Sequence, residues 1–168
     1  MAQTKQIQTA TENKKSPGGP LLCWDIFMEG YHALIQKADD IRQLKKMAKQ
    51  QNWKPQWDFQ KELVAYNYVI VVTNPASKIV FASQNIFEMT GYTAKELKGQ
   101  NPKMLQGENT DQHVIAHIKT GVTEAKPFET VILNYKKNGR PYHCRIKGFP
   151  VFNKKDELVN FIAFEQAA

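Results

Sequence analysis

The feature that most constrains the fold is a change in the spacing of apolar residues at position 68. Residues 68–73 read Tyr-Val-Ile-Val-Val-Thr, a run of β-branched and aromatic residues that is typical of a buried strand. Asn138-Gly139 separates two later runs of the same kind and is a strong signal for a tight hairpin. By these criteria we expect five strands, at residues 68–73, 78–82, 128–135, 140–149 and 158–164.

Helical patterns fill the interval between the second and third of these strands. We expect short helices at residues 85–89, 94–97 and 103–105, and a longer one at 113–120. Thr93 precedes the second short helix and Glu96 follows three residues later, which is the spacing of a capping box. Gly121 is expected to end the longer helix. The order of elements predicts an α+β fold: a five-stranded antiparallel sheet with helices inserted between its second and third strands.

The first 60 residues have a different character. Residues 1–20 are polar and end in Ser-Pro-Gly-Gly-Pro, so we expect a flexible tail. In residues 21–51 apolar side chains recur at spacings of three, four and seven, which predicts a helix. The stripe consists of Trp24, Phe27, Tyr31, Leu34, Ala38, Ile41 and Ala48. It fits a helix that pairs with a second copy and equally a helix that packs on its own domain. We divide the chain into a tail (1–20), a helical extension (21–60) and a domain (61–168).

Composition narrows the function further. The net charge is +7, but no run of five basic residues occurs, so we interpret the lysines as a solvated surface and do not expect nucleic-acid binding. Cys23 and Cys144 fit no metal-binding spacing. No signal peptide and no run of 18 apolar residues is present, so we expect a cytoplasmic protein without a membrane segment. His113 and His117 share a predicted helix face but have no third ligand in view, so neither a metal nor haem is expected.

Five segments together resemble PAS domains, whose fold has this order of strands and helices. They are Phe81-Ala82-Ser83, Thr90-Gly91-Tyr92-Thr93, residues 99–107 (Gly-Gln-Asn-Pro-Lys-Met-Leu-Gln-Gly), Thr110-Asp111-Gln112 and residues 134–139 (Asn-Tyr-Lys-Lys-Asn-Gly). The third segment is similar to the LOV branch of the family, which reads Gly-x-Asn-Cys-Arg-Phe-Leu-Gln-Gly. That branch binds flavin mononucleotide (FMN) and forms a light-driven bond from its cysteine to the flavin. Here Pro102 stands at the cysteine position, and a proline has no thiol to react.

The resemblance also implies which residues would contact FMN. The candidate contacts are Asn101, Lys103, Gln106, Lys119, Asn134, Cys144 and Glu165. Asn101, Gln106 and Asn134 keep the amides of the family. The two lysines replace arginines and lose the bidentate fork. Cys144 replaces an amide with a weak hydrogen-bonding group, and Glu165 replaces a glutamine with a group that only accepts when ionised.

The function we predict is a stand-alone PAS sensory and protein-interaction module of signal transduction, without cysteinyl–flavin photochemistry. The alternative is an FMN-binding protein that performs photoreduction or electron transfer without the covalent bond. No catalytic signature is present, so we do not expect an enzyme. The expected partners are a second copy, bound through the N-terminal helix or the sheet face, and a separate signalling protein. Cys144 is expected to point into the space between sheet and helices, as a small buried filler or as a redox-sensitive thiol.

Overall fold

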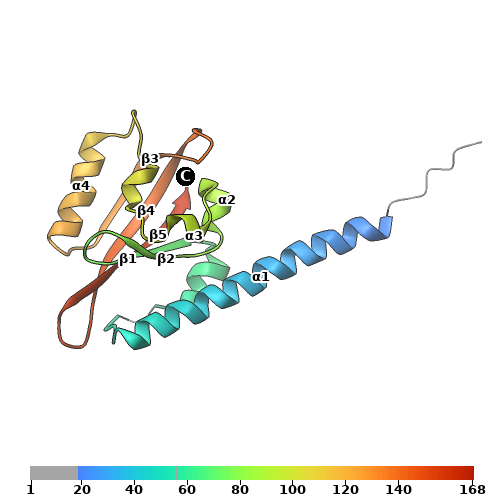
Figure 1. Cartoon of the computed structure of the whole chain (residues 1–168), viewed down its shortest axis with the longest axis horizontal. Coiled ribbons are helices and arrows are strands. Elements are labelled where there is room, and N and C mark those ends of the chain that lie inside the picture. Colours follow the sequence, from blue (N-terminus) through green and yellow to red (C-terminus); the bar gives the residue numbers. More distant parts are fainter. Residues whose placement is uncertain (1–18, 56) are drawn as a thin grey trace, which may run out of the picture. The chain divides into compact units, whose positions relative to one another are not determined.

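The computed structural model describes residues 19–55 and 57–168 (Figure 1). The helical elements are α1 (Gly19–Gln50), the π-helical turn η1 (Lys61–Ala65), α2 (Ile86–Thr90), α3 (Ala94–Leu97), the 3-10 turn η2 (Pro102–Leu105) and α4 (Gln112–Thr123). The strands are β1 (Val69–Thr73), β2 (Ile79–Ala82), β3 (Phe128–Tyr135), β4 (Pro141–Phe152) and β5 (Leu158–Ala167). Within the described residues these strands form one antiparallel sheet in the order β2-β1-β5-β4-β3. The predicted fold class, α+β with helices inserted between the second and third strands, is confirmed.

Two predicted helix boundaries need correction. Helix α1 begins at Gly19, earlier than expected, with Pro20 in its first turn, where a missing backbone N–H is tolerated. The rest of the predicted tail, residues 1–18, lies outside the described residues. Helix α4 continues through Gly121 to Thr123. Gly121 does not end this helix because its role is in packing: a Cβ there would lie 2.7 Å from the ring of Phe128.

The last two strands are longer than predicted. Strand β4 runs through Pro150 to Phe152, and β5 runs on to Ala167, which pairs with Cys144. Proline is tolerated in β4 because Pro150 lies beyond the last residue that pairs with β3, Gly148, so one side of the strand is already an edge there.

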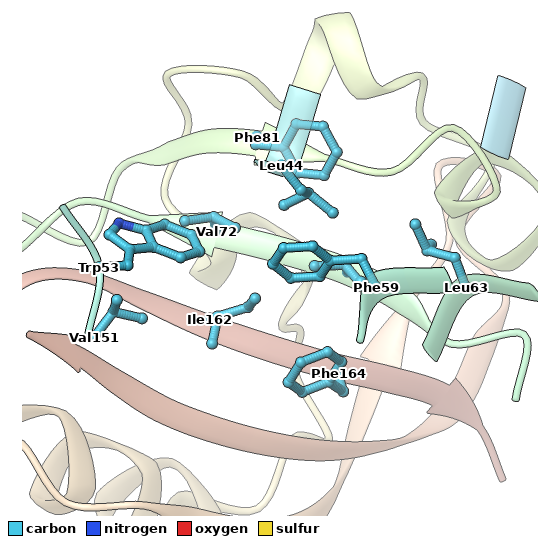
Figure 2. Packing of buried hydrophobic residues seen from close by; sticks show 10 residues of the cluster. Leu44, Trp53, Phe59, Leu63, Val72, Phe81, Val151, Ile162 and Phe164 are labelled. Atoms are coloured by element: carbon cyan, nitrogen blue, oxygen red, sulfur yellow. The ribbon is translucent and has the colours of Figure 1, made fainter. Parts of the chain in front are cut away.

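One face of the sheet carries an aromatic core, which we call the outer-face core. Its buried members are Leu44, Trp53, Phe59, Leu63, Ile70, Val72, Phe81, Val151, Ile162 and Phe164 (Figure 2). Trp53 also donates from Nε1 to Asn160 Oδ1 at 3.0 Å, and Asn160 donates in turn to the Thr73 carbonyl at 3.1 Å. Leu44 belongs to α1, so the second half of this helix packs on the domain to which it is joined.

The opposite face of the sheet carries a second cluster, which we call the cavity-face core. Its buried members are Val69, Val71, Ile79, Ala82, Ile86, Met89, Leu97, Leu105, Ile132 and Cys144. Ile115 and Ile118 of α4 pack against it. The segment from α2 to α4 therefore covers this face of the sheet.

Residues 33–168 form one compact unit. This unit includes the second half of α1, whereas the predicted division placed all of residues 21–60 in an extension. Where the extension ends and the domain begins stays a prediction. No helix among residues 19–55 and 57–168 has the length and apolar character needed to cross a membrane.

Candidate functional site

A cavity of about 630 Å³ lies between the sheet and the segment that runs from η2 through α4. This size falls within the range of ligand pockets, roughly 300–1,000 Å³. Its apolar wall comes from residues on both sides, including Val71, Leu105, Ile118, Ile146 and Phe161. An apolar body with a few inward-facing polar groups is the usual composition of a small-molecule site.

Most of the residues predicted as ligand contacts meet in this cavity. Those that line it are Asn101, Lys103, Gln106, Lys119, Asn134 and Glu165. Cys144 is not among the lining residues. It is fully buried in the cavity-face core, as expected for a filler, and its Sγ lies 3.7 Å from Glu165 Oε2.

The turn η2 explains the local role of two lining residues. Asn101 caps this turn: its Oδ1 accepts from the Lys103 backbone N–H at 3.0 Å. Pro102 occupies the first position of the turn, where proline is favoured because no backbone donor is needed. Pro102 itself lines the cavity. The position at which the LOV branch carries its reactive cysteine is therefore a wall residue with no nucleophilic atom.

A group of buried polar side chains lies on the sheet side of the cavity. Glu165 Oε2 is 3.7 Å from Cys144 Sγ, which also lies 3.8 Å from the Arg145 carbonyl. Burial raises the pKa of Glu165 to about 7, against a smaller opposing effect of the Cys144 contact. Burial, and after it the neighbouring Glu165, raises the pKa of the Cys144 thiol. The Tyr142 hydroxyl is buried without a hydrogen-bond partner, and burial raises its pKa as well.

Two cations line the same cavity from the helical side. Lys103 comes from η2 and Lys119 from α4, and both are exposed at the surface. Neither forms an ion pair with an acidic side chain of the described residues within 4.0 Å. Two free ammonium groups beside an apolar cavity suit a ligand whose body is buried and whose tail is anionic.

Sequence reasoning missed the aromatic wall of the cavity. Phe128, at the start of β3, lies so close to β4 that a Cβ at Gly148 would meet its Cζ at 2.3 Å. Gly121 of α4 lies against the same side chain, where a Cβ would be 2.7 Å from the Phe128 Cδ1. The ring therefore occupies space that two glycines provide. The relevant signal in the sequence is this pair of glycines, although its local neighbours favour Gly121 as a helix terminator.

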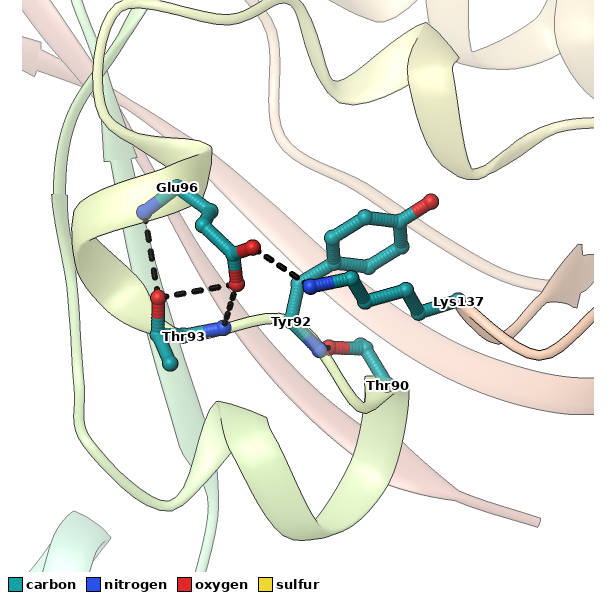
Figure 3. Close-up of polar contacts among 5 residues, drawn as sticks. All are labelled: Thr90, Tyr92, Thr93, Glu96 and Lys137. Atoms are coloured by element: carbon teal, nitrogen blue, oxygen red, sulfur yellow. Dashed lines mark hydrogen bonds and ion pairs between the residues drawn. The ribbon is translucent and has the colours of Figure 1, made fainter.

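A network of polar contacts fastens the β3–β4 turn to the short helices (Figure 3). Thr93 and Glu96 form the predicted capping box. Lys137, at the hairpin turn, donates to Glu96 Oε1 and places its Nζ 5.6 Å from the centre of the Tyr92 ring. Its backbone N–H also donates to the Thr90 carbonyl at 2.9 Å. The hydrogen bond from Lys137, followed by those from Thr93, lowers the pKa of Glu96 to about 2.

A second hollow of about 500 Å³ lies between the second half of α1 and the rest of the domain. Asp40 of α1 is buried there and accepts from the Gln84 backbone N–H at 2.8 Å, which joins α1 to the segment between β2 and α2. Its other oxygen, Oδ1, has no partner, and burial raises the pKa of Asp40 to about 6. Lys37 donates to Asn67 at 2.8 Å nearby.

His113 and His117 lie on exposed surface of α4. The described part of the chain contains no cluster of three His, Cys, Asp or Glu side chains that is arranged to hold a metal ion.

The sheet order, the helices over one face and the cavity between them define a PAS-type sensory domain. The family model of the PAS domain matches residues 67–166, and the chain belongs to this family. Relatives identify the LOV-like branch. The chain is 37% identical over 106 residues to Phototropin-1A of Oryza sativa subsp. japonica, a match that covers 61% of this chain and 12% of the relative. It is 36% identical over 97 residues to the Blue-light-activated histidine kinase of Brucella ovis, covering 56% of this chain and 20% of that protein.

Solved structures agree with this assignment. A Light-Oxygen-Voltage domain studied with a flavin analogue superposes with a TM-score of 0.62 at 25% identity, covering 67% of this chain and 85% of that chain. The dark structure of the blue-light photoreceptor Aureochrome1 LOV has a TM-score of 0.61 at 24% identity, covering 68% and 86%, and supports the fold alone. The matched region is a LOV-like PAS sensory domain of signal transduction. The chain spans only 12–20% of the length of the curated relatives named above.

Proposed function

We propose that this chain is a non-catalytic sensory and interaction module whose input is the occupancy of the cavity, without a covalent bond between protein and flavin. The observation that carries the proposal is Pro102, which lines the cavity where the LOV branch has its nucleophile. Cys144 is a poor substitute for this nucleophile, because it does not line the cavity and because its raised pKa keeps the thiol protonated. Its predicted role as a redox-sensitive thiol has no support from this environment.

The test is a pair of illuminated samples loaded with FMN. The natural chain is expected to keep its blue absorption band under light when no electron donor is added. Pro102→Cys restores a thiol at the wall and is expected to lose that band in light and recover it in the dark. A light-driven, reversible loss in the natural chain would contradict the proposal. Ala76→Cys, which adds a thiol to another lining position, is the matched control.

A second candidate function, FMN binding, is favoured by the composition of the cavity. Three amides and two lysines that the resemblance assigns to flavin contact all line it: Asn101, Gln106, Asn134, Lys103 and Lys119. The residues fit a planar ring with polar edges and a phosphate tail. When bound, a flavin supplies blue-light absorption and reversible reduction. Glu165 lines the cavity with a carboxyl group where the family has an amide, and Cys144 contributes no contact at the cavity surface.

The second test uses the purified chain of residues 1–168. Flavin binding predicts a yellow preparation, or uptake of added FMN with quenching of its fluorescence. Lys103→Glu together with Lys119→Glu should weaken FMN binding more than riboflavin binding, because riboflavin lacks the phosphate that the lysines would attract. A colourless protein that takes up neither compound would exclude a flavin and leave a different ligand as the input.

We infer that the output involves a second copy of the chain, bound through the first half of α1. Trp24, Phe27 and Tyr31 are 51–62% exposed and follow one another along the helix, with ring centres 5.9 and 6.4 Å apart. An exposed aromatic stripe of this kind is typical of an interaction surface. The other predicted surface, the sheet face, is less suited because the outer-face core already contains Leu44 and Trp53.

Light scattering on the full chain tests this inference. The natural protein is expected to be a dimer, and the triple variant Trp24→Ala, Phe27→Ala, Tyr31→Ala a monomer. Phe87→Ala is the matched control, because Phe87 is equally exposed, at 56%, but lies on α2. A natural protein that is monomeric, or a triple variant that remains dimeric, would rule out this surface. A separate signalling protein as a further partner, and a cytoplasmic location, stay predictions.

A further inference from the structure

The cavity contains one acidic side chain with an unusually weak set of partners. Glu165 is only 7% exposed and lines the cavity from β5. Its side-chain contact within the described residues is the thiol of Cys144, 3.7 Å from Oε2, and a thiol is a weak donor. Its other oxygen, Oε1, receives no hydrogen bond from these residues. An ionised carboxylate in this place would be buried with almost none of its acceptor sites satisfied, which strongly favours the neutral acid.

The surroundings of Glu165 supply no compensating charge. Its strand neighbours are apolar: Val69 lies opposite on β1 and Ile146 opposite on β4. The titratable and charged groups that face the same region are Cys144 and Tyr142 of β4, Lys103 of η2 and Lys119 of α4. Neither lysine forms an ion pair with Glu165 in the described part of the chain, and both extend to the exposed rim of the cavity.

We propose that Glu165 is held as the neutral carboxylic acid and donates its O–H to a carbonyl or ring-nitrogen acceptor of the ligand in the cavity. The proposal rests on the flavin-binding function above and names the ligand group that this residue recognises. Cys144 lies beside Oε2, so the free side of the carboxyl group faces the cavity. A glutamine at this position would donate from its amide at every pH, whereas a glutamic acid donates only while it is protonated.

Ligand affinity should therefore depend on pH. While Glu165 is protonated it stabilises the acceptor on the ligand. After deprotonation the same oxygen becomes an acceptor and repels a carbonyl, so binding weakens as the pH rises past neutrality. If the ionised carboxylate were the binding form, for instance as the acceptor of a ligand N–H, binding would instead become stronger as the pH rises.

Riboflavin is the better probe, because it carries no phosphate whose own titration would overlap with that of Glu165. The experiment measures its dissociation constant by fluorescence quenching between roughly pH 5 and pH 9, with the full chain and with Glu165→Gln. In the natural chain the constant should increase above neutral pH, by up to about tenfold per pH unit, until binding through the other contacts takes over. In Glu165→Gln it should stay constant. Glu157→Gln, at an exposed turn, should behave like the natural chain.

Infrared spectroscopy provides a readout without any ligand. At neutral pH the unliganded chain should show the C=O stretch of a protonated carboxylic acid, and this band should be much weaker in Glu165→Gln, where only the small protonated fraction of Asp40 remains. A natural chain without this band, or riboflavin binding with the same pH dependence in the natural chain and in Glu165→Gln, would overturn the proposal and leave flavin binding standing. Failure of riboflavin and FMN to bind at any pH would overturn both.

Discussion

Replacing Glu165 by glutamine is expected to raise the unfolding free energy relative to that of the natural chain, and to raise it more above neutral pH than in acid. Burial raises the pKa of this carboxyl from its usual 4.5 to about 7. Below pH 4.5 both the folded and the unfolded chain carry the proton, so the residue costs nothing. As the pH rises from 4.5 to about 7, the unfolded chain ionises first and folding must retain a proton, so the natural protein loses stability.

The size of this effect follows from the two pKa values. Each pKa unit corresponds to ~1.36 kcal/mol, so the rise from 4.5 to about 7 corresponds to about 3 kcal/mol of lost stability. Glutamine does not titrate and avoids this loss. Any constant difference between the two side chains in packing or hydrogen bonding is the same at every pH, so it cancels when the two pH values are compared.

The assay is urea denaturation of the natural chain and of Glu165→Gln at roughly pH 4 and at about pH 8. The difference in unfolding free energy between the two proteins should shift toward the variant by about 3 kcal/mol at the higher pH. Asp40→Asn serves as a control, because burial also raises the pKa of Asp40 but its effect should be complete by about pH 6. Parallel stability curves for the natural chain and Glu165→Gln would refute the burial argument.

Three further experiments test the packing and the helix capping. Gly148→Ala should destabilise the protein by about 1–3 kcal/mol in thermal denaturation, because the new Cβ meets the ring of Phe128, and Phe128→Val should relieve most of that loss; equal losses in both backgrounds would contradict the contact. Asn160→Ala should cost about 1–3 kcal/mol, because the buried indole N–H of Trp53 loses its 3.0 Å acceptor and keeps only the longer contact to Gln51 Oε1 at 3.5 Å; an unchanged urea midpoint would contradict this contribution. Thr93→Ala should cost about 1 kcal/mol and Thr93→Ser much less, because only the first removes the helix cap.

The strands and short helices could be predicted because their signals are local. The Asn138-Gly139 turn, the Thr93 cap and the period-two runs each depend on neighbours a few residues away. The boundaries failed where a long-range contact decided. Gly121 reads as a helix terminator from its own neighbourhood, but the ring of Phe128 requires a residue without a side chain at that point of α4.

The candidate site shows the same limit. The resemblance located six lining residues, because short sequence segments identify them. It placed Cys144 in the cavity wall too, whereas the sheet buries this thiol beside Glu165. The apolar stripe of α1 predicted a helix but not which part packs on the domain: Ile41 and Ala48 pack against the outer-face core, while Trp24 is exposed. Periodicity identifies a face, and only the three-dimensional contacts show where along the helix that face is covered.

We propose that this PAS domain acts as a sensor without a reactive thiol in its cavity. The most direct measurement is the absorption spectrum of the FMN-loaded full chain before, during and after blue light, without an added electron donor and beside Pro102→Cys. The blue band of the natural chain should stay unchanged, and that of the variant should be lost reversibly, if the proposal is correct. A reversible loss in the natural chain would contradict it, because Pro102 offers no atom that can bond to the flavin.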